Sequence, residues 1–168
     1  MKALQTDLAA ILLEAESMES ENDAFRSFLN QQPATLLDQK VQAINETIAT
    51  KIDCTECGNC CKSLLINVTS SEAEKLADQL QLNLQEVKKL YLDESEGGQL
   101  LMNKIPCHFL IDKKCSIYAH RFNSCRDFPH LEQAGFNKRL FSLFMHYGTC
   151  PIIFNVMENL KIQTGFKQ

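Results

Sequence analysis

Cysteine is the residue type whose number and spacing in this chain could do chemistry. Eight cysteines occur in 168 residues, all of them in the C-terminal two-thirds of the chain. The most informative segment is Cys54-Thr-Glu-Cys57-Gly-Asn-Cys60-Cys61. A C-x2-C pair on a tight turn lets two thiolate sulfurs approach one metal ion, and backbone N–H groups around Gly58 can hydrogen-bond those sulfurs. The spacing therefore predicts a thiolate metal site.

The kind of metal centre stays open at this point. The first three cysteines form a C-x2-C-x2-C run, which is similar to the ligand run of a cubane iron-sulfur cluster, and such sequences also use a Cys-Pro pair like the remote Cys150-Pro151. Cys60 and Cys61 are neighbours whose side chains usually diverge, so we expect them to serve two ions or two sites. Eight thiols can form two four-sulfur sets or a binuclear centre with bridging thiolates. The expected cofactor is Zn2+ or iron, the latter in an iron-sulfur cluster.

Basic residues near the cysteines can offset the charge of such a centre. A four-thiolate zinc site or an oxidised four-iron cluster carries about two negative charges, which need compensation when buried. Arg121 and Arg126 bracket Cys125 and are the expected counter-charges, whereas Lys113 and Lys114 are expected to lie in water. With this many thiols, no histidine is required as a ligand. The four histidines are His108, His120, His130 and His146.

The composition narrows the class of protein. A formal net charge of −4 argues against a nucleic-acid-binding surface, which usually shows a basic excess. The N-terminal apolar run Leu8–Leu13 is too short for a signal peptide or a membrane span, so we expect a cytoplasmic protein without a membrane partner. In the reducing cytosol a Cys-rich pattern is typical of metal binding rather than of disulfides, which remain the alternative.

Two helices are predicted before the cysteines. Apolar residues recur at helical spacing from Leu4 to about Phe28, Pro33 breaks the pattern, and a second helix is expected from Ala34. We expect these helices to form an antiparallel pair, an N-terminal arm over residues 1–50. The apolar stripe of the second helix either packs on the rest of the domain or recruits a protein partner. That stripe consists of Leu37, Val41, Ile44 and Ile48.

Short elements are predicted around the cysteines. The β-prone run Leu64–Val68 favours a short strand, and the capping-box pairs Ser71/Glu74 and Asn83/Glu86 predict helices over about Glu72–Leu80 and Leu84–Leu92. These elements belong to a cysteine-rich domain that we expect to be organised around the metal.

The remaining segments complete a mainly α fold with a few short strands. Leu100–Ile105 is expected to return as a strand, residues 117–121 form a helical turn, and residues 131–145 fit either a helix or a strand. Pro151 is expected at the first position of a last helix, where its missing N–H has no partner to lose. The cysteine-cluster metal-binding domain would then span residues 51–168.

The order of these motifs carries a family resemblance. The quoted segments are Cys54-x2-Cys57-Gly58-x-Cys60-Cys61, Pro106-Cys107-x-Phe109-Leu110, Cys115-x-Ile117-Tyr118-x2-Arg121 and Cys125-Arg126-x-Phe128-Pro129. Their order resembles the CxxCxxCC family of zinc- or iron-chelating domains, also called YkgJ-like cysteine cluster proteins. The resemblance covers roughly Cys54 to Cys150. It implies as metal ligands Cys54, Cys57, Cys60, Cys61, Cys107, Cys115, Cys125 and Cys150.

The resemblance implies metal chelation more firmly than any activity. We therefore expect a metal-binding protein that chelates zinc or iron through its cysteines, with its cellular role open and no catalytic residue assigned. The alternatives are an iron-sulfur redox protein, an accessory to a protein-modifying enzyme, or a metal-delivery protein. A nucleophilic Cys-His enzyme is the weakest reading, since one catalytic cysteine does not require seven companions. A protein partner could bind the N-terminal helices, and the sequence does not indicate an oligomeric state.

Overall fold

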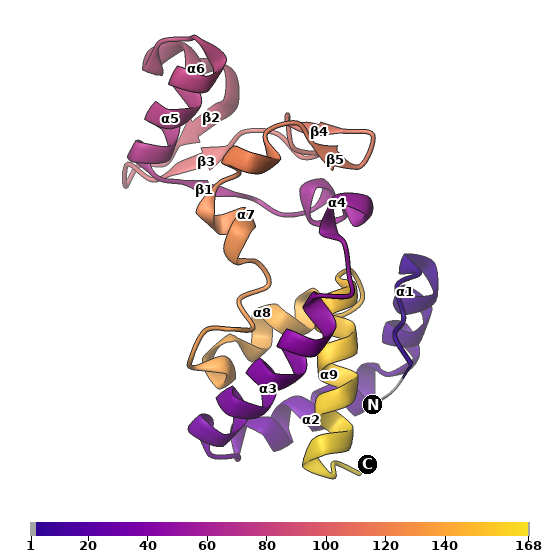
Figure 1. Ribbon diagram of the computed structural model, residues 1–168. Helices are drawn as coiled ribbons and strands as arrows, with labels where there is room; N and C mark the ends of the chain where they lie inside the picture. Colours follow the sequence, from indigo (N-terminus) through magenta and orange to yellow (C-terminus); the bar gives the residue numbers. More distant parts are fainter. Residues whose placement is uncertain (1–2, 168) are drawn as a thin grey trace. The chain divides into compact units, whose positions relative to one another are not determined.

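The computed structural model describes residues 3–167 and is mainly α, with a few short strands, as predicted (Figure 1). The chain forms two compact units. One unit combines the residues up to Asp53 with those from Pro129 onward, and the other runs from Cys54 to Phe128. The C-terminal segment thus groups with the N-terminal helices, whereas the sequence analysis grouped it with the cysteines. No helix in the described part of the chain has the length and apolar character needed to cross a bilayer.

The first unit, called the helical unit below, contains one helix more before the cysteines than predicted. The long helix expected over residues 4–28 is interrupted at Met18, whose φ of −105° and ψ of 15° leave the helical region. Three helices therefore replace the expected pair. The helices of the unit are α1 (Leu8–Ser17), α2 (Glu19–Asn30), α3 (Ala34–Ala49), the 3-10 helix η3 (Phe136–Arg139), α8 (Leu140–Met145) and α9 (Pro151–Thr164).

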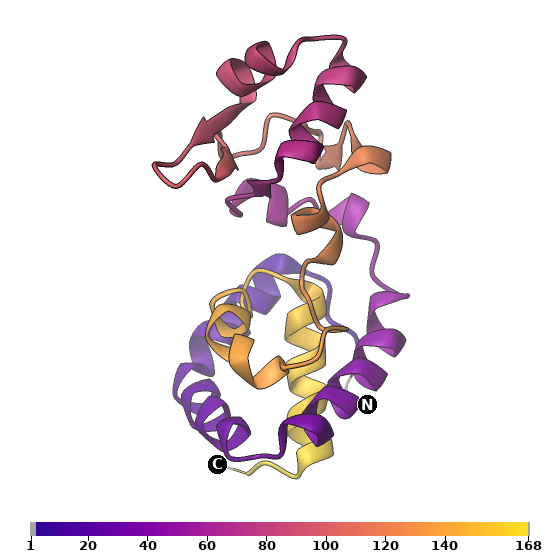
Figure 2. The same cartoon turned by 90° about the vertical axis from the view of Figure 1, so that its left-hand side faces the viewer.

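Helix α9 forms the centre of the helical unit. Pro151 occupies its first turn, as predicted, and every residue from there to Lys161 is buried. Figure 2 shows α9 in yellow, surrounded by the other helices of the unit. Helix α3 packs against α9 and η3. All four residues of its predicted apolar stripe are at most 3% exposed. The stripe is therefore a core face, as expected if it packs on the rest of the domain.

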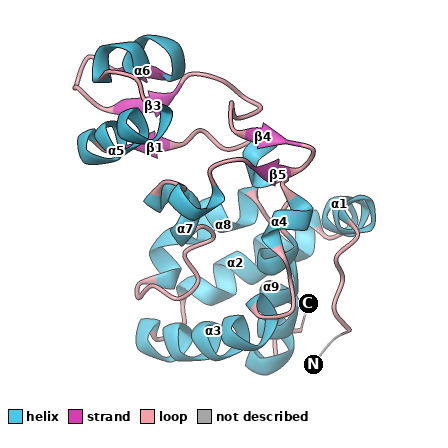
Figure 3. Ribbon diagram, turned by 45° about the horizontal axis from the view of Figure 1, so that its top comes forward, coloured by secondary structure: helices cyan, strands magenta, loops and turns pink. Residues whose placement is uncertain are grey.

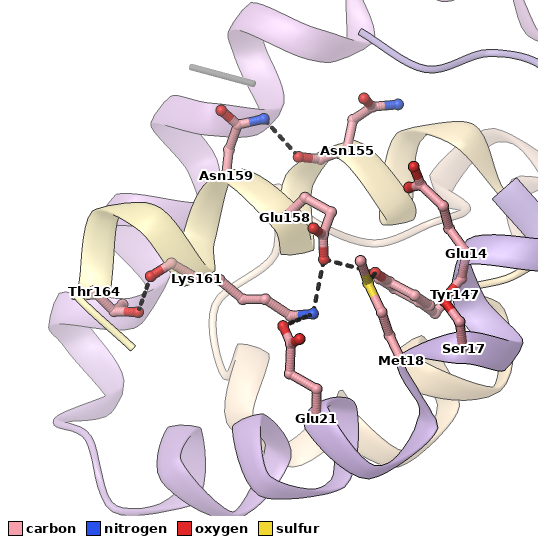
Figure 4. Close-up of polar contacts among 10 residues, drawn as sticks. All are labelled: Glu14, Ser17, Met18, Glu21, Tyr147, Asn155, Glu158, Asn159, Lys161 and Thr164. Carbon is pink, nitrogen blue, oxygen red and sulfur yellow. Dashed lines mark hydrogen bonds and ion pairs between the residues drawn. The ribbon is translucent and has the colours of Figure 1, made fainter. Parts of the chain in front are cut away.

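A polar network is buried inside this helical core (Figure 4). Lys161 Nζ lies 2.8 Å from Oε1 of Glu158 and 2.8 Å from Oε1 of Glu21. The Tyr147 hydroxyl donates a hydrogen bond to Glu158 Oε1 at 2.6 Å. Burial raises the pKa of Tyr147, and the neighbouring Glu158 carboxylate raises it further. The single ammonium group of Lys161 therefore contacts two carboxylates, the buried one of Glu158 and the partly exposed one of Glu21.

The second unit, called the cysteine unit below, is built from short elements. Its three-stranded antiparallel sheet has the order β1-β3-β2, and a separate β4–β5 hairpin lies beside α4 (Figure 3). The elements are α4 (Cys54–Cys57), η1 (Cys60–Lys62), β1 (Asn67–Val68), α5 (Ser70–Leu80), α6 (Leu84–Tyr91), β2 (Leu92–Glu94), β3 (Leu100–Met102), β4 (Leu110–Ile111), β5 (Lys114–Cys115), η2 (Tyr118–His120) and α7 (Asn123–Asp127).

Helices α5 and α6 both begin with a capping box. The predicted box of α6 is present, because Glu86 N donates to the Asn83 side chain at 3.0 Å and Asn83 N to Glu86 Oε2 at 2.9 Å. The box predicted for α5 from Ser71 was wrong by two residues. Thr69 is the capping residue, and its partner is Glu72. A Thr and a Ser at nearby positions satisfy the same short motif, and the extended backbone of Thr69 decides which residue caps.

The apolar core of the cysteine unit supports part of the cysteine cluster. Val68, Val87 and Met102 are at most 4% exposed and belong to one continuous buried cluster. The cysteines at 107, 115 and 125 pack directly against this cluster. Three separate chain segments therefore bring their cysteines to the same core.

Candidate metal centre

The structure distributes the eight cysteines unequally between the two units. Seven of them lie in the cysteine unit, whereas Cys150 is the N-cap residue of α9 in the helical unit. All eight are thiols rather than disulfide sulfurs. Cys54 is exposed, and the other seven are half-buried. The disulfide alternative therefore finds no support in the structure.

The first four cysteines are held by a loop with a glycine at its tightest point. Gly58 adopts φ of +58°, a left-handed conformation that favours glycine. A Cβ at this position would collide with the backbone carbonyl of Lys113, in the turn of the β4–β5 hairpin. Cys107 N also donates to Cys61 O at 2.8 Å. The loop is thus fastened to the segments that carry the next two cysteines.

The later cysteines are positioned by the hairpin and by α7. Cys115 lies on β5 and pairs with Leu110 on β4. Cys125 lies in α7, where its N–H donates to Phe122 O at 3.0 Å. The Ser124 hydroxyl beside it donates to Asn67 O on β1 at 2.9 Å. Backbone hydrogen bonds and one side-chain contact therefore fix where these thiols lie relative to the sheet.

Six of the seven cysteines in this unit line one cavity of about 120 Å3. A site for one water needs roughly 10–15 Å3 by the same kind of measure, so the cavity is larger than a single water-sized occupant requires. Cys57 does not border this cavity, although it belongs to the same loop. The lining cysteines are Cys54, Cys60, Cys61, Cys107, Cys115 and Cys125.

The cavity wall contains residues to which sequence reasoning gave no role. Phe109, Phe122 and Phe128 form an apolar wall, and Tyr118 lies beside them. Phe109, Tyr118 and Phe128 stand in the quoted motifs, where their recurrence near cysteines was a usable signal. Phe122 lies outside these motifs. An apolar wall excludes water and strengthens interactions between charges inside the cavity.

Cys60 and Cys61 do not diverge as the sequence analysis expected. The Cys61 thiol donates a hydrogen bond to the Cys60 sulfur, which lowers the pKa of Cys60 to about 7. The same contact raises the pKa of Cys61. Both residues lie in the 3-10 turn η1 and both line the cavity, so adjacent positions in the sequence contribute sulfurs to one place.

Burial opposes ionisation of the deeper thiols. It raises the pKa of Cys107, and it raises the pKa of Cys125 to about 12, with further contributions from nearby cysteines. Arg121 opposes this shift at Cys125, in line with its expected role as a counter-charge. Arg121 and Arg126 both line the cavity. The thiols are close enough to disfavour several thiolates together, so an additional cation would stabilise them.

Histidine takes no part in the cavity lining. His108 follows Cys107 in sequence, but its ring lies 2.7 Å from Asn103 Oδ1 and packs edge-to-face on Tyr91. Within residues 3–167, no three or more histidine, cysteine, aspartate or glutamate side chains form a ready-made arrangement for a metal ion. The cavity therefore gathers sulfur without presenting a complete coordination shell, and the ligand role of the eight cysteines stays a prediction.

One of three comparisons with known proteins identifies a family. No curated protein and no solved structure matches the chain. The sequence profile of the CxxCxxCC family, described as "Putative zinc- or iron-chelating domain", matches residues 53–143. This match covers more than half of the chain and includes all seven cysteines of the cysteine unit. The chain therefore belongs to the CxxCxxCC family.

Proposed function

We propose that this protein binds zinc or iron through cysteine thiolates gathered in the cysteine unit. The observation that carries this proposal is one cavity lined by six cysteine thiols, from the Cys54–Cys61 loop and from the three segments that carry Cys107, Cys115 and Cys125. Thiolate sulfur is a preferred ligand of both zinc and iron-sulfur clusters. Cys57 is included as a ligand because of its C-x2-C spacing with Cys54. The ligand role of Cys150, which lies in the helical unit, is implied by the family resemblance alone.

The pKa shifts explain why a metal would stabilise this arrangement. Burial and neighbouring sulfurs make the protonated form of Cys125 and Cys107 favourable without a cation. A bound metal ion reverses that preference, because it stabilises thiolates and releases their protons. Rotation of the cysteine side chains would then draw the sulfurs into a coordination shell. A centre saturated by four thiolates has no open position, so its role would be structural.

The number of thiols in the cavity favours an occupant with more than one metal atom. A single tetrahedral ion takes four ligands, whereas six cysteines line the cavity. Two zinc ions with bridging thiolates or an iron-sulfur cluster would both use more than one set of ligands. The C-x2-C-x2-C run at Cys54 favours the cluster, and with it the second candidate function of electron transfer or service to a protein-modifying enzyme.

The deciding experiment is anaerobic purification of the full chain from its own host, followed by elemental analysis and visible absorbance. Brown protein with iron and sulfide would identify the cluster, and colourless protein with stoichiometric zinc would identify a zinc centre. Either result supports the proposal. Protein that folds with no stoichiometric metal, and takes up none on reconstitution, would contradict it.

A variant pair separates ligand loss from simple destabilisation. We expect Cys125→Ser to reduce bound metal, because it removes a cavity sulfur. The matched control is Val87→Thr, which places a hydroxyl in the same unit's core at a fully buried position but leaves every sulfur in place. Val87→Thr should lower stability by about 1–3 kcal/mol and keep the metal stoichiometry. Equal metal loss in both variants would contradict the assignment of Cys125 as a ligand.

A further inference from the structure

A second pocket in the cysteine unit is polar and basic. It has a volume of about 230 Å3 and lies between α5 and the segment from η2 to α7. The metal-binding proposal does not use this pocket. Its basic lining residues are Lys75, His120, Arg121 and Arg126.

The side chains of both arginines donate hydrogen bonds to nearby backbone carbonyl oxygens. Arg121 donates from Nη1 to Tyr118 O at 3.0 Å, and its guanidinium lies 4.0 Å from the centre of the Tyr118 ring. Arg126 donates from Nη2 to Arg121 O at 3.3 Å. A guanidinium carries five N–H donors, so these contacts orient each side chain and leave donors for a ligand. A planar fork of this kind matches the oxygens of carboxylate and phosphate groups.

The one carboxylate that lines the pocket is already engaged. Glu72 Oε1 accepts a hydrogen bond from Asn123 N at 2.6 Å, and Glu72 Oε2 accepts from Thr69 N at 2.9 Å and from the Thr69 hydroxyl at 2.8 Å. These contacts hold Glu72 in its capping role. Three permanently charged cations, Lys75, Arg121 and Arg126, therefore line the pocket together with one carboxylate, and the surplus of two positive charges matches a dianion better than a monocarboxylate.

We propose that this pocket binds a phosphate group, either inorganic phosphate or a small phosphate monoester. The two arginines would donate to the phosphate oxygens, Lys75 would add a third cation, and His120 can donate through a ring N–H in either protonation state. Arg121 and Arg126 also line the cysteine cavity, so they are shared by the two sites. The proposal goes beyond metal binding and does not depend on it.

The test is calorimetric titration of the full-length protein with inorganic phosphate at constant ionic strength. We expect saturable binding, weakened about tenfold or more in Lys75→Gln, since a charge-assisted hydrogen bond is lost. Lys75 is exposed and lines only this pocket, so its substitution should not disturb folding. The matched control is Lys89→Gln, an exposed lysine on α6 that lines neither pocket and should leave the affinity unchanged.

A second titration with glycerol 2-phosphate distinguishes the source of the phosphate. Tighter binding of the ester identifies the pocket as the phosphate end of a larger ligand site, and equal or weaker binding identifies free phosphate. Absence of saturable binding at millimolar phosphate overturns the proposal, as does equal weakening by Lys75→Gln and Lys89→Gln. Acetate that competes as well as phosphate overturns it too. Metal content measured on the same samples keeps this outcome separate from that of the metal-binding proposal.

Discussion

Two groups of buried ionisable side chains set the chemistry of individual residues in this protein. In the cysteine unit, the Cys61 thiol donates a hydrogen bond to the Cys60 sulfur, which lowers the pKa of Cys60 and raises that of Cys61. In the helical unit, Lys161 offsets the carboxylates of Glu158 and Glu21. The first arrangement is suited to exchanging protons for a cation, whereas the second brings a buried cation into contact with two carboxylates.

The Tyr147 hydroxyl makes the stability of the helical unit sensitive to alkaline pH. Its raised pKa means that the fold favours the neutral phenol. This stabilisation is fully present below the ordinary tyrosine pKa of about 10 and is lost as the pH rises toward the higher folded-state value. We expect the free energy of unfolding of the natural chain to fall more steeply above about pH 10 than that of Tyr147→Phe.

The measurement is urea unfolding of both proteins between about pH 8 and about pH 11, followed by helical circular dichroism. At neutral pH, Tyr147→Phe should lose about 1–2 kcal/mol, because the hydrogen bond to Glu158 is removed. Two curves that run parallel through the alkaline range would show that Tyr147 does not carry this pH dependence.

At the scale of elements, short turns rather than long helices position the cysteines. Helix α4 has four residues and η1 has three, so neither is stable without tertiary contacts. The β4–β5 hairpin supplies those contacts, because its Lys113 carbonyl lies directly against Gly58. The cysteine loop and the hairpin therefore pack so closely that a methyl group added at position 58 has no room.

Gly58→Ala should disrupt this packing. The left-handed backbone costs a non-glycine residue about 1–2 kcal/mol, and the collision with Lys113 O adds to that cost. We expect lower thermal stability of the cysteine unit and reduced metal content. Gly97→Ala is the control, since the nearest atom to its added Cβ is 3.9 Å away. Metal content that is unchanged in Gly58→Ala would show that the loop can shift without loss of the centre.

At the scale of the whole molecule, each unit has its own apolar core. The helical unit buries Phe25, Ile44 and Phe154 to at most 2% exposure, and its polar network needs no metal. The cysteine unit has a smaller core of short strands and helices, with thiols packed against it. A bound metal therefore contributes a larger share of the folding stability in a unit with such a small core than in the helical unit.

Metal removal should therefore affect the two units unequally. Addition of a strong chelator to the full-length protein should raise hydrogen exchange in α4 and the β4–β5 hairpin, while amides of α3 and α9 keep their protection. Mass spectrometry of peptides from the exchanged protein measures both units in one sample. Equal loss of protection in α9 would contradict a metal-independent helical core. Unchanged exchange in α4 after complete metal removal would favour the delivery alternative over a structural metal.

Local sequence patterns were sufficient to predict several helices. The spacing of Leu37, Val41, Ile44 and Ile48 predicted the buried face of α3, the Asn83 box predicted the start of α6, and Pro151 predicted the start of α9. The segment from Leu131 to Met145 stayed ambiguous, and the structure forms helices η3 and α8 there. Helical periodicity and helix caps depend on residues within a few positions of each other, so they can be recognised in the sequence without knowledge of the fold.

The amino-acid sequence alone was enough for the number and order of the cysteines, the family and the mainly α class, because these follow from residue identity and short-range pattern. Only the tertiary structure decided that six cysteines share a cavity, that Cys60 and Cys61 meet, and that residues after Phe128 join the N-terminal helices. It also decided that a basic pocket shares two arginines with that cavity. These outcomes depend on side-chain rotamers and on packing between distant segments, which no local pattern encodes.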